Sequence, residues 1–101
     1  MNIDEMPAGT EMDRCVAEKV MGWDPSEWHQ GQDCRRWKPS NDIAHAWEVV
    51  EKIRDRYAVS LHAGILPSGF TPYAAMVKGI KSYADTAPLA ICRAVLKAVE
   101  A

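Results

Sequence analysis

The residue types best suited to recognition are gathered in one short run, Trp28 to Trp37, with the sequence WHQGQDCRRW. Trp and Arg are the residues most enriched at binding hot spots. A guanidinium at Arg35 or Arg36 can also clamp a phosphate or stack on a base. The candidate binding residues are therefore Trp28, His29, Arg35, Arg36 and Trp37. Two interpretations stay open: the run is a recognition surface, or its tryptophans fill the core beneath solvated arginines.

The same run contains a weak metal-ligand pattern. His29 and Cys34 are five residues apart, and Asp33 and Cys15 could join them. Zinc needs three or four ligands at tetrahedral distances, and the chain has neither a CxxC nor an HxxxH unit. We therefore expect no metal and no cofactor. Cys34 beside Arg35 is a candidate reactive thiol, because a neighbouring cation favours the thiolate, but this does not make it a catalyst.

Nothing else in the sequence has the pattern of a catalytic site. The acidic residues Glu18, Asp33, Glu48 and Glu51 contain no pair that local spacing forces into an acid/base arrangement. Cys15 and Cys92 fall on apolar helix faces, where a thiol usually behaves as a small hydrophobic group. The chain also lacks a glycine-rich phosphate loop. These observations predict that the protein is not an enzyme.

Length, charge and cysteine content narrow the class of protein. A chain of 101 residues, 48% of them hydrophobic, is expected to form a single domain over residues 1–101. The net charge of −2 argues against general nucleic-acid binding. Three widely spaced cysteines do not make a disulfide framework, and no apolar run approaches the ~18 residues of a membrane span. We expect a cytoplasmic protein that does not bind membranes.

Hydrophobic periodicity predicts two helices in the first part of the chain. Residues 10–22 form the first, with Thr10 as its cap, and residues 23–39 form a Trp-rich loop. The second follows a cap at Ser40 and ends near Tyr57. Its apolar side chains recur at steps of three and four: Ile43, Ala46, Trp47, Val50, Ile53 and Tyr57. We predict that Trp47, Val50 and Ile53, in the middle of this stripe, are buried.

The second part of the chain predicts a small antiparallel sheet and a last helix. Residues 59–65 alternate as a half-buried strand, and the turn residues at 66–72 precede a second strand over 73–83, with Gly79 as a bulge. The last helix begins at Asp85 or Thr86, with Pro88 in its first turn. The fold class is α+β: three helices packed on a small antiparallel sheet, in the order helix, Trp-rich loop, helix, strand, strand, helix.

Three runs carry a resemblance to a known family. They are VAEKVMGW (16–23), SNDIAHAWEVVEK (40–52) and DTAPLAICRAVLKA (85–98). Together they resemble the phage ABA sandwich domain, which implies helices around a small antiparallel sheet and implies no reaction. The chain departs from the family pattern at His45, where a small residue is usual, and in the loop from Trp28 to Trp37.

The resemblance favours a non-enzymatic phage or prophage accessory protein. We expect it to bind a bacterial host or defence protein in the host cytoplasm. This expectation rests on the small size, the acidic charge and the phage-type resemblance rather than on the chemistry of a site. The alternative is a protein that binds or sequesters a small nucleotide-type molecule through the Trp and Arg side chains of the loop from Trp28 to Trp37. Self-association as a homodimer is also favoured, because a small sheet has open edges that need cover.

Overall fold

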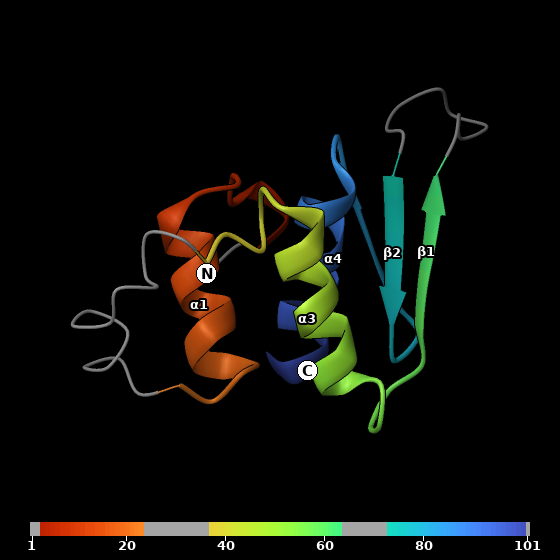
Figure 1. The fold of residues 1–101 in the computed structure, drawn as a ribbon. Coiled ribbons are helices and arrows are strands. Elements are labelled where there is room, and N and C mark those ends of the chain that lie inside the picture. Colours follow the sequence, from red (N-terminus) through yellow and green to blue (C-terminus); the bar gives the residue numbers. More distant parts are fainter. Residues whose placement is uncertain (1–2, 24–36, 64–72, 101) are drawn as a thin grey trace.

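The structure, a computed structural model, describes residues 3–23, 37–63 and 73–100 (Figure 1). It confirms the α+β class and the order of the helices. The elements, in chain order, are a 3-10 turn η1 (Ile3–Glu5), helices α1 (Thr10–Lys19) and α3 (Ile43–Ile53), strands β1 (Val59–Ala63), β2 (Tyr73–Val77) and β3 (Ile80–Ala84), and helix α4 (Ala87–Glu100).

The sheet has three antiparallel strands in the order β1-β2-β3. The prediction of one long strand over 73–83 is wrong, because this segment folds back as the hairpin of β2 and β3. Lys78 and Gly79 form its two-residue turn, with φ of 55° and 78°. Positive φ at both positions matches the twist of the flanking strands. Gly79 therefore makes a turn rather than a bulge, and the predicted second strand is two strands.

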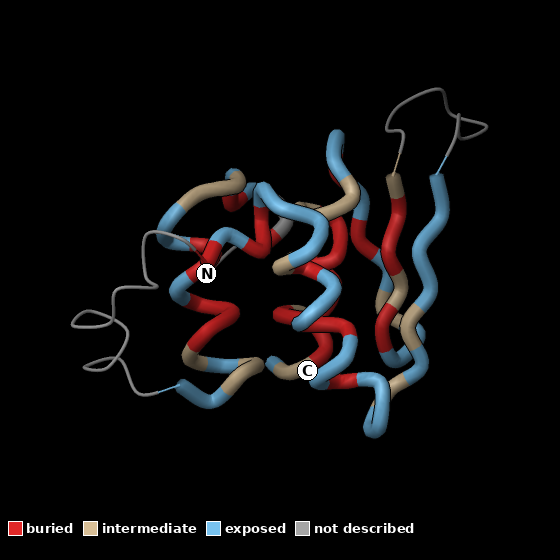
Figure 2. The backbone as a smooth tube through the Cα atoms, viewed as in Figure 1, coloured by how far each residue is buried: buried red, intermediate tan, exposed pale blue. Residues whose placement is uncertain are grey.

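Helix α4 is the centre of the molecule. It packs on β2 and β3 and also contacts α1 and α3, so that the sheet and the other two helices lie on different sides of it (Figure 1). Ala90, Ala94 and Ala98 are buried along it, at 0%, 0% and 1% exposure. Small side chains of this kind let neighbouring backbones approach closely. In Figure 2 the buried positions accordingly cluster where the three helices and the inner strands meet.

The start of α3 differs from the predicted cap. Asp42 is the N-cap, and its carboxylate accepts a hydrogen bond from the Ala44 N–H at 2.8 Å. Ser40 is instead completely buried, and its N–H and hydroxyl donate hydrogen bonds to the Asp13 carboxylate. The Thr10 cap is also wrong, since α1 is preceded by Gly9, which has no side chain to offer.

The start of α4 agrees with the prediction. The Thr86 hydroxyl accepts a hydrogen bond from the Leu89 N–H at 3.4 Å, and the helix begins one residue later at Ala87. Pro88 stands in the first turn, where its missing N–H would have no intrahelical partner.

Candidate recognition surface

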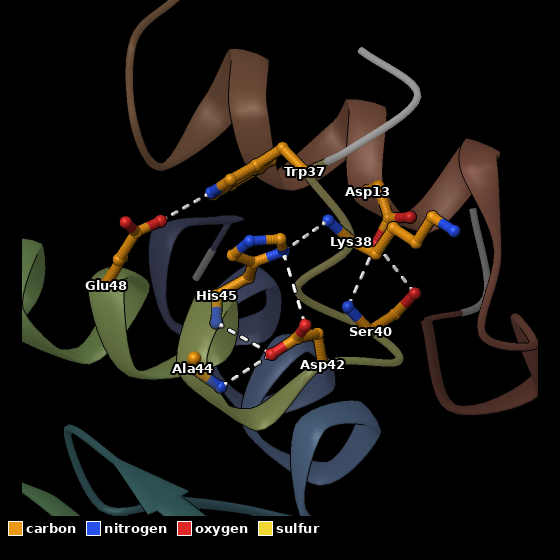
Figure 3. Close-up of polar contacts among 8 residues, drawn as sticks. All are labelled: Asp13, Trp37, Lys38, Ser40, Asp42, Ala44, His45 and Glu48. Carbon is orange, nitrogen blue, oxygen red and sulfur yellow. Dashed lines mark hydrogen bonds and ion pairs between the residues drawn. The ribbon is translucent and has the colours of Figure 1, made fainter. Parts of the chain in front are cut away.

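Trp37 is the one predicted binding residue that falls within the described part of the chain. It is 5% exposed, and its indole Nε1–H donates a hydrogen bond to Glu48 Oε2 at 2.7 Å (Figure 3). Its ring also packs on Trp23, with the ring centroids 4.5 Å apart. This burial favours the core-filling alternative for Trp37. Trp28, His29, Arg35 and Arg36 lie outside the described residues.

A buried carboxylate holds the segment before α3 against α1. Asp13 on α1 is 4% exposed, and its Oδ1 accepts from both the Ser40 N–H at 2.9 Å and the Ser40 hydroxyl at 2.7 Å (Figure 3). The Gly9 N–H in turn donates to the Ser40 hydroxyl oxygen at 3.0 Å. Burial raises the pKa of Asp13, and the Ser40 hydrogen bonds partly oppose that shift. Asp13 therefore has a structural partner rather than a free acid/base position.

His45, where the sequence indicates a departure from the family pattern, takes part in the same anchoring. Its Nδ1 accepts a hydrogen bond from the Lys38 N–H at 2.9 Å, so this nitrogen carries no proton in that bond. The Asp42 carboxylate lies 3.9 Å from the same nitrogen. Figure 3 shows His45 and Glu48 pointing from α3 toward Trp37 and the segment that precedes the helix. That side of α3 is therefore held by its polar side chains.

The apolar surface of α3 extends well beyond its buried stripe. Ala46, Val49, Val50 and Ile53 are buried, which confirms the predicted burial of Val50 and Ile53. Trp47, however, is 52% exposed, so its predicted place in the core is wrong. Ile43, the first residue of the same apolar stripe, is 48% exposed.

Helix geometry explains the exposure of these two residues. Successive residues turn by about 100°, so Ile43 and Trp47 share a row. This row lies on the far side of the buried stripe from His45 and Glu48, which approach Trp37. We call the row of Ile43 and Trp47 the α3 apolar surface. Trp47 and Ile43 have the largest exposed fractions among the large hydrophobic residues that the structure describes.

The sequence contained a signal for this surface that periodicity alone did not use. Counting Val49, the apolar residues of α3 cover about half of the helix circumference. A helix that packs on one neighbour usually needs a stripe little wider than ~100°. Because α4 is the principal neighbour of α3, the excess width had to face something else. Trp47 is at the edge of the stripe and is the residue left exposed.

Four of the remaining candidates for chemistry, Glu48, Glu51, Cys15 and Cys92, are bonded or have a raised pKa. Glu48 accepts from Trp37, and Glu51 pairs with Arg54 at 3.3 Å. Burial raises the pKa of the Cys15 and Cys92 thiols, which disfavours the reactive thiolate at both. Cys34 and Asp33 lie outside the described residues, as does His29 of the metal pattern. Within the ranges 3–23, 37–63 and 73–100, no three potential metal ligands come together.

These features define a small α+β protein built around one central helix. Its candidate recognition surface is the α3 apolar surface rather than a cluster of polar side chains. The chain belongs to the phage ABA sandwich domain family, whose model matches residues 14–96. A comparison with curated proteins gives no match. The chain is similar to a phage protein from Bacillus cereus ATCC 14579 of known crystal structure. The two are 27% identical, the match covers 91% of this chain and 87% of that one, and the TM-score is 0.68.

The family and the structural neighbour agree with the resemblance seen in the sequence and establish a phage-type protein. Among the helices of the described segments, none is long and apolar enough to cross a bilayer.

Proposed function

We propose that this phage protein is a non-enzymatic accessory factor that binds a bacterial host or defence protein in the host cytoplasm through its α3 apolar surface. The observation that carries the proposal is the 52% exposure of Trp47, with Ile43 48% exposed beside it. Trp is the side chain most typical of a binding hot spot, because it brings a large contact area with few rotatable bonds. An exposed apolar row on a helix fits a complementary apolar groove of another protein.

The helix that carries Trp47 is held rigidly, which favours binding. Asp42 caps its first turn, His45 is bonded to the Lys38 N–H, and Glu48 to the Trp37 indole. Ordering a flexible segment on binding costs free energy that a preorganised helix does not lose. The contacts on one side of α3 therefore support recognition on the other.

Charge also supports a protein partner at this surface. The nearest charged residues along the exposed side of α3, Glu51 and Arg54, form an ion pair with each other at 3.3 Å. Because the two charges are opposite and lie together, this pair gives the surface beside Trp47 no net charge. The nucleotide-binding alternative depends instead on Arg35 and Arg36, which lie outside the described residues.

The test has two stages. Tagged wild-type protein is used to capture proteins from lysate of the bacterial host, with the tag alone as the control, and a protein retained only by the tagged chain is then purified. Its affinity for wild type and for the Trp47→Ala variant is measured by isothermal titration calorimetry. We expect Trp47→Ala to weaken binding at least tenfold, a loss of about 1.4 kcal/mol, as for a hot-spot residue.

Two further variants separate the possible outcomes. Tyr83→Ala removes a 43% exposed aromatic residue from β3 and is the matched control, with affinity expected within about twofold of wild type. The double variant Arg35→Ala with Arg36→Ala tests the loop. If it abolishes binding while Trp47→Ala leaves the affinity unchanged, recognition belongs to the loop and the proposal for α3 is wrong.

A further inference from the structure

Strand β1 has an open edge whose backbone groups can be identified from the register. The central strand β2 alternates its hydrogen bonds between its two neighbours. Lys78 N donates to Ala58 O, so the even-numbered residues of β2 face β1. In the register their partners on β1 are Ser60 and His62. The N–H and C=O groups of the intervening residues, Val59, Leu61 and Ala63, therefore point away from the sheet.

The opposite edge of the sheet is covered. The same alternation turns the carbonyl groups of Lys81 and Tyr83 outward on β3. The Lys81 carbonyl accepts from Lys97 Nζ at 3.1 Å, and the Tyr83 carbonyl accepts from Arg93 Nη1 at 2.9 Å. Two cationic side chains of α4 thus occupy the outward acceptors of this edge, and β3 also carries the charge of Lys81.

Within residues 3–23, 37–63 and 73–100, strand β1 shows none of the features that usually protect an edge. Proteins discourage edge pairing with lysine, proline, bulges or a covering element. The strand reads Val-Ser-Leu-His-Ala, without a lysine, an acidic residue or a proline, and it pairs with β2 without a bulge. Four of its five residues are exposed, and Leu61 is 38% exposed (Figure 2). Within the described ranges no side chain bonds to its outward groups.

We propose that β1 pairs antiparallel with β1 of a second copy of this chain, across a two-fold axis that passes between the two Leu61 residues. Only residues 59, 61 and 63 have outward groups, so an antiparallel register must match these residues with each other. The register that pairs all five residues sets Leu61 opposite Leu61 of the second copy and Val59 opposite Ala63. The two three-stranded sheets then form one continuous sheet. This inference is independent of the proposed binding partner.

The strand is compatible with itself in charge and in apolar character, which favours a second copy over an unrelated strand. A two-fold interface brings the same patch together with itself, so any charge on the axis would repel its own copy. Here the axis holds an exposed leucine, and Ser60 faces His62, so that no like charges are opposed. Leu61 lies opposite Ala75 on the sheet face that α4 covers, so pairing continues an apolar layer.

The first test is the state of association of the full chain, measured by sedimentation velocity over a series of concentrations. We expect a reversible dimer that dissociates on dilution. Leu61→Lys sets two cations opposite each other on the axis and should weaken the dimer at least tenfold, while its thermal melting curve at concentrations where both proteins are monomers stays that of wild type. Tyr83→Lys makes the same charge change on the covered edge and should leave the dimer intact. A wild-type monomer at every concentration, or equal effects of both variants, would overturn the proposal.

The second test fixes the register. In a Cys34→Ser background, Leu61→Cys should form a disulfide between copies on mild oxidation. Directly opposed residues of a hydrogen-bonded antiparallel pair have Cα atoms roughly 5.5 Å apart, within the range of roughly 4.4–6.8 Å that a disulfide spans. Ala63→Cys is the matched control, because each Ala63 faces Val59 and the two Ala63 residues are far apart. Equal cross-linking of both variants, or none at Leu61→Cys, would contradict pairing about Leu61.

Discussion

The two flanks of the buried stripe of α3 differ from each other, and both depart from the usual amphipathic pattern. On one side the polar residues are engaged: His45 bonds the Lys38 N–H and Glu48 bonds the Trp37 indole. On the other side the apolar residues Ile43 and Trp47 are about half exposed. In an ordinary surface helix the polar side faces solvent and the apolar side is covered.

This difference shows that two independent sets of contacts fix the helix. The buried stripe of α3 packs against α4, and the polar side is bonded to the segment at residues 37–42. With both sets in place, the helix cannot rotate to bury Trp47 without losing the bonds of His45 and Glu48. The apolar surface stays exposed because the rest of the helix is held, and this is the condition a binding surface requires.

The largest expected effect tests the buried stripe. Ile53 is 4% exposed at the end of α3, and Ile53→Ala removes side-chain carbon atoms from the core and leaves a cavity. We expect the free energy of unfolding to fall by about 2–5 kcal/mol. Chemical denaturation followed by circular dichroism measures this loss. A loss below about 1 kcal/mol would mean that the stripe does not hold the helix.

Asp13 tests the polar side, with an intermediate effect. Asp13→Ala leaves the buried Ser40 N–H and hydroxyl without their acceptor, which should cost about 1–3 kcal/mol. Asp13→Asn is the matched control, because its amide oxygen can still accept these bonds but does not titrate. A loss in Asp13→Asn as large as in Asp13→Ala would show that the negative charge, rather than the acceptor, matters.

The same pair of proteins gives a pH dependence with a definite sign. Burial raises the pKa of Asp13 in the folded state above its ordinary value of 3.8. The folded state therefore holds this proton more tightly than the unfolded state does. The stability of wild type relative to Asp13→Asn should be greatest below pH 3.8 and fall as the pH rises through the raised pKa. A difference that increases with pH would contradict burial as the dominant cause.

The sequence predicted those parts of the fold that depend on neighbouring residues. The three helices and the burial of Val50 and Ile53 follow from hydrophobic periodicity, the start of α4 follows from a cap at Thr86, and the structure confirms them. The hairpin turn was missed because Lys78 adopts a positive φ, which its residue type does not indicate. Gly79 alone was compatible with either a bulge or a turn.

The candidate site was less accessible to sequence reasoning because long-range contacts determine it. The hydrogen bond between Asp13 and Ser40 joins residues 27 positions apart, and no local sequence pattern predicts it. Because Ser40 bonds Asp13, the N-cap of α3 is Asp42 rather than Ser40. The periodic spacing placed Trp47 on the apolar stripe and therefore in the predicted core. How much of that stripe is buried depends on how much of α3 the neighbouring helix α4 covers. Only the assembled helices settle which edge remains exposed.

The smallest expected effect on stability is that of Trp47→Ala, which contrasts the exposed row of α3 with its buried stripe. An indole that is 52% exposed loses little contact when it is removed, and no neighbouring group is left without a hydrogen-bond partner among those described. Alanine also has a higher helix propensity than tryptophan, which offsets up to about 0.7 kcal/mol of the loss. We expect a net change below about 1 kcal/mol, well under the 3–5 kcal/mol for a fully buried aromatic residue. Chemical denaturation of Trp47→Ala and Ile53→Ala under the same conditions gives the contrast directly.

If the two losses are equal, Trp47 belongs to the core and the α3 apolar surface is not available for binding. If Trp47→Ala is as stable as wild type, any loss of partner affinity in that variant reports recognition rather than unfolding.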